Sequence, residues 1–370
     1  MLRYKSYIAL FAVAMVMASC SQDVIHDSDI CENEVYATLP ELNYGNSEGG
    51  VTRSALVYDY SAQKMRFTWE EGDQLGVFPI IEDAGRRQQI RFDLMKGAGT
   101  AGGAFDSYDE SIKAISQNSE YVAFRPYTTE DDYTKLNVFY NSQVASAWPM
   151  MKYCPSFKQN PYKDEEKYKD SEKAASAHLS KADYMVSLPV VAEGNGHCAF
   201  EFKRVGAVVR FYLKSPRAMV YDGLQLLVKG KKFVHTGMLN ATTRTITPVT
   251  TGSYLDLTFL PALDMTNTNS DYYYNGKGYI VSYMMVAPID LSDAENVILY
   301  LKGHVGNTPY YYKAKGPLAK PNLKANDFYQ WTSADNSDDG AIIFDEISVQ
   351  DWERDVTYSN GEEGTGTGSW

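Results

Sequence analysis

The chain has 370 residues, with 35 Lys and Arg against 47 Asp and Glu, which gives a formal net charge of −12. Its apolar fraction of 44% and charged fraction of 22% exclude a wholly disordered chain, and its length suffices for one large domain or two. The acidic balance argues against nucleic acid as a partner, because no basic surplus exists to displace the counterions of phosphates. The 29 Tyr residues, against 15 Phe and 5 Trp, favour strands with polar-tipped, half-exposed side chains.

The N-terminal residues have the pattern of an export signal. Arg3 and Lys5 precede an apolar stretch over residues 8–18, which is too short to span a membrane and has the length of a signal-peptide core. Residues 16–20, VMASC, resemble a bacterial lipobox, and this resemblance implies that residues 1–19 are removed and that Cys20 carries a lipid. The alternative is a plain secretory signal in which Cys20 has no special role. No later segment reaches 18 consecutive apolar residues, so we expect no membrane-spanning helix.

The segment that follows, residues 20–53, is polar and acidic. One strand-like run, VYATL at residues 35–39, interrupts it, and it closes on Gly49, Gly50 and Arg53. Exposed loops of small and polar residues are the sites at which proteases cut. We therefore interpret residues 20–53 as a tether or propeptide that contains one pairing strand.

The cysteines are compatible with export and predict no metal site. With Cys20 lipidated, Cys31, Cys154 and Cys198 remain, and there is neither a CxxC motif nor a Cys/His spacing of the zinc type. Cys154 and Cys198 either form a disulfide in an oxidising compartment or remain as unpaired buried thiols.

Alternation of apolar and polar residues, typical of strands, begins at Ser54 and takes up most of the chain. The best helix candidate is the charged stretch at 163–173, whose alternating charges are more typical of a solvated loop or a short helix. Short strands separated by Gly, Pro, Asn and Asp turns are typical of sandwiches and barrels. We predict an all-β fold of two tandem antiparallel β-sandwich domains, 54–198 and 199–358, before a flexible tail at 359–370. The expected strands are 56–60, 65–69, 75–80, 90–94, 121–124, 138–140, 184–186, 200–213, 224–228, 254–259, 279–286, 297–301, 310–313, 328–331, 341–344 and 347–352.

No set of residues with a catalytic pattern survives inspection. Residues 97–102 match GxGxxG, but a dinucleotide site needs this loop to open a helix, and residues 103–107 predict a turn and a second strand instead. The five histidines are scattered, and no HExxH or P-loop motif occurs. We therefore predict no enzyme, no cofactor and no metal. Two aromatic clusters are either sugar-stacking platforms or strand packing: Tyr272, Tyr273 and Tyr274, and Tyr310, Tyr311 and Tyr312.

Several segments, in this order, resemble the fimbrillin family, the pilin-type lipoproteins of type V pili in Gram-negative anaerobes. They are the lipobox, VTRS at 51–54, FTWEEGDQLGVF at 67–78, the glycine-rich turn at 97–105, YVAFRPY at 121–127, DYM at 183–185, FEFKRVGA at 200–207, the run at 323–329 and ISVQDW at 347–352. The resemblance covers nearly the whole chain, and its specificity lies in the order and spacing of the segments. It implies transthyretin-like sandwiches and a function without catalysis.

The resemblance also implies a route of assembly. The precursor would be anchored in the outer membrane through the lipid on Cys20 and reach the cell surface, where an arginine-specific protease would cut between Arg53 and Ser54. Loss of the preceding strand would leave unpaired backbone groups and an apolar groove, which a strand from another fimbrial subunit can fill. The candidates for strand exchange are Val35, Ala37 and Leu39 in the removed strand, and Ile343, Ile347, Val349 and Trp352 in the C-terminal donor region.

A different class of function stays open from the sequence. The chain is either a structural or adhesive subunit of a homo- or heteropolymeric fimbria, or a surface-anchored lipoprotein that binds a glycan or a host protein without polymerising. The N-terminal residue of the mature protein separates these two hypotheses.

Overall fold

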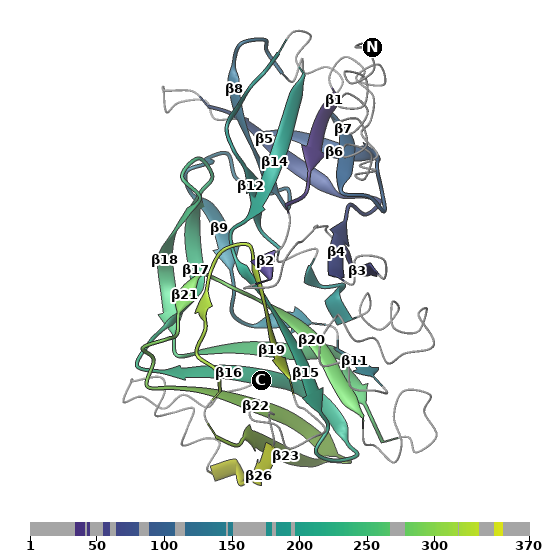
Figure 1. Cartoon of the computed structure of the whole chain (residues 1–370), viewed down its shortest axis with the longest axis vertical. Helices are drawn as coiled ribbons and strands as arrows, with labels where there is room; N and C mark the ends of the chain where they lie inside the picture. Colours follow the sequence, from purple (N-terminus) through teal and green to yellow (C-terminus); the bar gives the residue numbers. More distant parts are fainter. Residues whose placement is uncertain are drawn as a thin grey trace, which may run out of the picture.

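A computed structural model describes most of the chain as β-structure. The described residues are 34–40, 43–44, 55–59, 64–80, 89–107, 115–145, 147–150, 175–179, 183–193, 197–266, 278–316, 318–332 and 344–350. They form 26 strands in several sheets (Figure 1), which confirms the predicted all-β class. Four pairs of neighbouring strands run parallel, and the other described pairs are antiparallel. None of the described segments forms a long apolar helix of the kind that crosses a membrane.

The largest sheet has eight strands in the order β12-β14-β1-β7-β6-β5-β8-β13. Because β12 pairs with β8 as well as with β14, this sheet closes on itself. The glycine-rich motif at 97–102 is the turn between β6 and β7, as predicted, and Gly97 adopts a φ of 96° there. The strands are β1 (Glu34–Thr38), β5 (Gln74–Pro79), β6 (Ile90–Lys96), β7 (Gly102–Ser107), β8 (Glu120–Arg125), β12 (Met185–Ser187), β13 (Val190–Val191) and β14 (Cys198–Arg204).

A six-stranded sheet and a five-stranded sheet pack face to face in the other half of the molecule (Figure 1). The six-stranded sheet has the order β10 (Gln143–Ala145), β19 (Tyr254–Asp264), β16 (Val220–Lys229), β22 (Asn296–Val305), β23 (Thr308–Ala314) and β26 (Phe344–Ile347). The five-stranded sheet has the order β11 (Ala147–Met150), β20 (Tyr279–Val286), β15 (Ala207–Lys214), β25 (Asp327–Thr332) and β2 (Asn43–Tyr44).

Three smaller sheets complete the described part of the fold. They are β9 (Leu136–Phe139) with β17 (Phe233–Asn240) and β18 (Thr245–Gly252), β21 (Ile289–Asp290) with β24 (Asn322–Leu323), and β3 (Ala55–Asp59) with β4 (Lys64–Thr68). The β17–β18 hairpin was not among the expected strands. Because most of β18 is exposed on both faces, it lacks the alternating apolar pattern by which strands are recognised.

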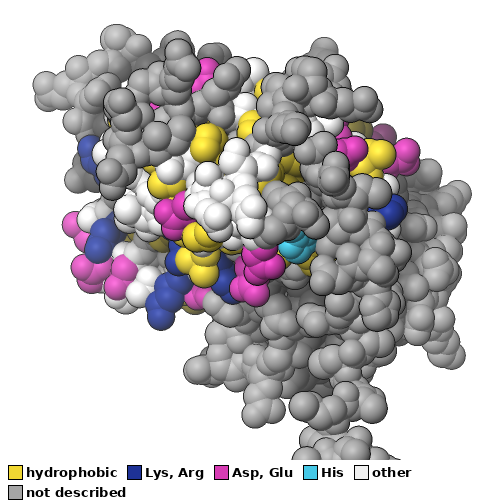
Figure 2. Space-filling view, turned by 90° about the horizontal axis from the view of Figure 1, so that it is seen from above, with side chains coloured by type: hydrophobic (Ala, Val, Ile, Leu, Met, Phe, Trp, Pro, Cys, Tyr) yellow, Lys and Arg dark blue, Asp and Glu magenta, His cyan; other side chains and the backbone are white. Residues whose placement is uncertain are grey.

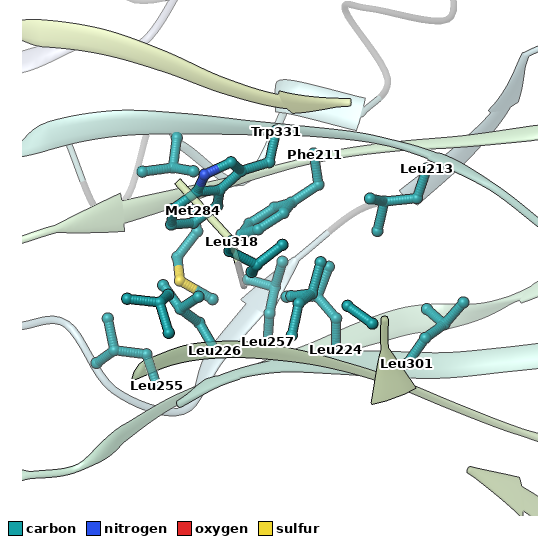
Figure 3. Packing of buried hydrophobic residues seen from close by; sticks show 14 of the residues in the cluster. Phe211, Leu213, Leu224, Leu226, Leu255, Leu257, Met284, Leu301, Leu318 and Trp331 are labelled. Atoms are coloured by element: carbon teal, nitrogen blue, oxygen red, sulfur yellow. The ribbon is translucent and has the colours of Figure 1, made fainter. Parts of the chain in front are cut away.

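The core of the sandwich is an apolar layer between the six- and five-stranded sheets. Phe211 and Trp331 from one sheet lie against Leu224, Leu226 and Leu257 from the other (Figure 3). Strands β15 and β20 of the five-stranded sheet are buried on both faces, because a second apolar cluster on the other side of this sheet joins them to residues of β4, β5 and β8. The two halves of the chain therefore share buried contacts.

The structure corrects two of the expected strands. The single strand expected at 200–213 is two strands, β14 and β15, because the chain passes from the eight-stranded to the five-stranded sheet at Val205 and Gly206. The strand expected at 347–352 ends at Ile347, and residues 349–350 are helical. The division into domains at residue 198 stays a prediction, and residues 199–204 pair within the eight-stranded sheet.

Candidate functional site

The first described strand, β1, lies inside the eight-stranded sheet rather than at its edge. It pairs parallel with β14, with Ala37 opposite Phe200, and antiparallel with β7, with Ala37 opposite Gly103 (Figure 1). An internal strand supplied by the N-terminal end of the chain is therefore held by two ladders of backbone hydrogen bonds. We call the space between β7 and β14 that residues 34–40 occupy the β1 slot.

The strand predicted at residues 35–39 is confirmed, and its alternation decides which side chains are buried. Val35 and Ala37 are 0% exposed and Leu39 is 3% exposed, all within one apolar cluster that includes Trp69 and Phe105. Tyr36 and Thr38 point to the other face and are half-buried. The β1 slot thus has an apolar face for every second residue of the strand that fills it.

Two buried side chains donate hydrogen bonds to backbone carbonyls of the segment in the slot. Trp69 Nε1 donates to the Ala37 carbonyl at 3.2 Å, and Arg204 Nη1 donates to the Pro40 carbonyl at 3.5 Å. The Trp69 ring is fixed by Phe105, whose centroid lies 4.9 Å away. Removal of residues 34–40 would leave both donors without these acceptors in an apolar surrounding, which is costly.

Buried ion pairs hold the donors in place. Arg204 Nε lies 2.8 Å from Asp183 Oδ2, both side chains are 0% exposed, and the guanidinium lies 3.9 Å from the centroid of the Phe67 ring. Arg125 Nη2 pairs with Asp73 at 2.8 Å, and the Arg125 guanidinium lies 5.8 Å from the centroid of the Trp69 ring. These contacts explain why the motif segments at 67–78, 121–127, 183–185 and 200–207 matter together: in the fold they meet beside the β1 slot. The sequence alone did not indicate this arrangement.

The N-terminal segment also contacts the five-stranded sheet. Its second strand, β2, pairs parallel with β25, with Asn43 opposite Asp327 and Tyr44 opposite Phe328. The N-terminal segment therefore contributes β1 to the eight-stranded sheet and β2 to the five-stranded sheet.

The C-terminal donor candidates lie at a sheet edge or outside the described residues. In β26, Ile347 is opposite Tyr311 of β23, which is the one neighbour of this strand among the described strands. Val349 follows the strand and is 40% exposed. Ile343 and Trp352 lie outside the described residues, as do Cys20, Arg53 and Ser54.

The aromatic cluster at residues 310–312 lies in strand β23. Tyr311 and Tyr312 are buried, at 9% and 3% exposure, so their rings pack within the fold. Tyr310 is half-buried, and the guanidinium of Arg217 lies 4.1 Å from its ring centroid. This burial favours strand packing over a sugar-stacking platform of three rings. Tyr272, Tyr273 and Tyr274 lie outside the described residues.

The remaining candidates are a cysteine and a small depression. Cys198 is a buried free thiol, and burial raises its pKa to about 12, whereas Cys154 lies outside the described residues. A depression of about 370 Å³ lies at the end of the eight-stranded sheet, lined by Thr68, Trp69, Glu70, Glu71, Ala98 and Gly99.

Seen from above, charged side chains of both signs mix with small apolar patches on the described part of the surface (Figure 2). Within the described ranges, no group of three or more His, Cys, Asp or Glu residues is placed to hold a metal.

Comparison with solved structures finds distant relatives. A proposed cell adhesion protein of Bacteroides uniformis is 14% identical, with a TM-score of 0.43, over 76% of this chain and 92% of that one. A fimbrial protein of Bacteroides ovatus is 11% identical, with a TM-score of 0.30, over 81% of this chain and 48% of that one. A fimbrial assembly protein of Parabacteroides distasonis is 9% identical, with a TM-score of 0.31, over 86% of this chain and 96% of that one.

Comparison with curated protein sequences finds no match. The sequence profile of a family described as fimbrillin-like, in contrast, matches residues 62–352, which is most of the chain. The matched region includes the motif segments that meet beside the β1 slot. The chain therefore belongs to the fimbrillin-like family.

Proposed function

We propose that this protein is a structural or adhesive subunit of cell-surface fimbriae, exported as a lipoprotein through Cys20 and assembled by strand exchange at the β1 slot. The observation that carries the proposal is the position of β1. It is an internal strand of the largest sheet, yet it lies upstream of Arg53 in the chain. A cut between Arg53 and Ser54 would therefore sever this strand from the rest of its sheet.

Physical consequences of that cut support assembly. Without β1, the facing edges of β7 and β14 would carry unpaired N–H and C=O groups, and the apolar side chains around Phe105, Phe200 and Phe202 would face water. Such an edge is a template for a strand from another chain. An added strand restores both ladders and the apolar burial, so subunits join head to tail.

The donor in the proposal is the C-terminal region that contains Ile343, Ile347, Val349 and Trp352. Strand β26 makes four residue pairs with one neighbour, whereas β1 makes four with β14 and five with β7. Among the described residues, the donor strand β26 is thus held by fewer backbone pairs than the strand that it would replace. Breaking these four pairs costs less than breaking the nine pairs of β1.

Limited proteolysis tests this proposal. An arginine-specific protease should convert the full chain into a product that begins at Ser54 and that forms oligomers with other fimbrial subunits from the same cells, detected by N-terminal sequencing and native mass spectrometry. The matched control Arg53→Lys should stay intact and monomeric. A product beginning at Ser54 that stays monomeric at high concentration in the presence of these subunits would contradict strand exchange.

Export is tested separately on cells. Labelled palmitate should enter the wild-type chain and not the Cys20→Ser variant. Intact chain from Cys20 to Trp370 as the sole mature form on cells would favour the alternative function, a surface-anchored lipoprotein that binds a glycan or a host protein without polymerising.

A further inference from the structure

We propose that Gly103 and Trp69 form a size filter at the centre of the β1 slot, so that the slot accepts a strand with a small residue between two bulky apolar ones. The partner that fits is then a subunit of different sequence, rather than the C-terminal region of a second copy of this chain. This inference rests on the proposed strand exchange.

The filter consists of a glycine and the indole packed against it. A Cβ atom placed on Gly103 would lie 2.9 Å from Trp69 Cδ1 and 2.8 Å from both Leu94 Cδ1 and Phe105 Cε2. Real Cβ atoms do not approach side chains this closely, so the ring of Trp69 fills the space that the glycine leaves. The residue of β1 opposite Gly103 is Ala37, whose carbonyl accepts the Trp69 hydrogen bond and whose side chain is 0% exposed.

The neighbours of Ala37 on the same face are larger. Val35 and Leu39 are two residues away on either side and are buried in the same cluster. The segment in the slot therefore reads bulky, small, bulky at every second position. Extra methylene groups are poorly tolerated in a fully packed site.

A size filter fixes the register of the strand that fills the β1 slot. A strand shifted by one residue turns its apolar face outward and is rejected by burial alone. A strand shifted by two residues keeps its apolar face inward, so burial does not reject it. Such a shift would place the bulk of Val35 or Leu39 against Trp69 and Gly103, and the filter excludes it.

The C-terminal region of this chain lacks the accepted pattern. In the sequence IFDEISVQDW at 343–352, the residue between Ile343 and Ile347 is Asp345, and the residue two positions beyond Val349 is Asp351. Between residues 341 and 370, no small residue lies two positions from a bulky apolar residue on both sides. The β1 slot of this chain and its own C-terminal region are therefore not matched to each other.

The filter itself is tested in the uncut full chain. Ala37→Leu adds bulk on the inner face, and the matched control Thr38→Leu adds similar bulk on the half-buried outer face. We expect a clear fall in the thermal midpoint for Ala37→Leu and little change for Thr38→Leu. Equal midpoints would overturn the size filter.

Partner choice is tested on a full chain that carries a sequence-specific protease site in place of residues 46–53. After cleavage, native mass spectrometry measures how much of the bound segment is replaced by synthetic peptides. A peptide of residues 33–44 should exchange, its Thr38→Leu form should exchange similarly, and its Ala37→Leu form and a peptide of residues 340–352 should exchange at least tenfold less.

The outcomes separate the two proposals. Failure of the 33–44 peptide to exchange would overturn strand exchange, and with it the choice of partner. Exchange of the 340–352 peptide as readily as the 33–44 peptide would overturn the preference for a different subunit, while strand exchange would stand.

Discussion

Replacement of Arg204 by Met should destabilise the fold far more than the small difference in side-chain size suggests. The guanidinium and the Asp183 carboxylate are 2.8 Å apart, both 0% exposed, and the guanidinium also lies 3.9 Å from the Phe67 ring centroid. Removal of one partner from a buried pair leaves an uncompensated charge and typically costs about 3–5 kcal/mol. The lost ring contact adds about 0.5–2 kcal/mol. We therefore expect a loss of at least about 3 kcal/mol in the free energy of unfolding at pH 7.

The double variant Arg204→Met with Asp183→Leu tests whether the loss of stability arises from the unpaired charge of Asp183. With both charges removed, apolar side chains fill the site, and most of the loss should be recovered. Lys203→Met is the matched control, because Lys203 is the adjacent, exposed residue of the same strand. It should change stability by less than about 0.5 kcal/mol.

Urea denaturation gives the free energies, and hydrogen exchange of the β1 amides reports the local effect. Because Arg204 also donates to the Pro40 carbonyl just after β1, exchange of these amides should accelerate in Arg204→Met and not in Lys203→Met. A loss in Arg204→Met no larger than in Lys203→Met would refute this reasoning. So would a double variant that is as unstable as the single one.

Three further predictions concern acid stability and the core. Burial raises the pKa of Asp256 to about 6, so its carboxylate costs stability as pH rises through 4 to 6. In urea denaturation, the free energy of unfolding of Asp256→Asn should equal that of the wild type at pH 4. At pH 7.5 it should exceed the wild-type value by about 1–3 kcal/mol. Burial lowers the pKa of His178 to about 4, so folding stability is lost as pH falls from 6.5 to 4. His178→Gln should lose less stability than the wild type over this interval. An unchanged dependence of stability on pH would contradict the lowered pKa of His178. Leu226→Ala, fully buried in the sandwich core, should cost about 2–5 kcal/mol, whereas Leu260→Ala, 67% exposed, should cost under about 0.5 kcal/mol; similar losses would contradict the packing.

The sequence predicted much of the secondary structure, because strand formation leaves a local signal. Alternation identified the run at 35–39, and the glycines at 97–102 indicated the turn before β7. The prediction failed where the local signal was misleading. The strand expected at 200–213 is continuous in pattern, yet it divides between two sheets. The β17–β18 hairpin has little alternation and was missed.

The candidate site could be predicted only in part. A strand upstream of Arg53 was expected, but its place between β14 and β7 follows from pairings with residues far along the chain. Trp69 and Ala37 are 32 residues apart, and Arg204 and Pro40 are 164 apart. No local pattern encodes which tryptophan donates to which carbonyl, or which arginine stays buried because an aspartate is within reach.

The sequence by itself therefore determined the all-β class, the membership of the motif segments in one ordered set, and the alternating apolar face of residues 35–39. Tertiary structure alone decided that this face lies inside a sheet, that β1 runs parallel to β14, and that Gly103 and Trp69 narrow the slot opposite Ala37. The physical reason is the distance along the chain between the residues that decide each feature. Alternation depends on neighbouring residues, whereas strand order, register and the space left for one side chain depend on contacts that form only when the whole chain has folded.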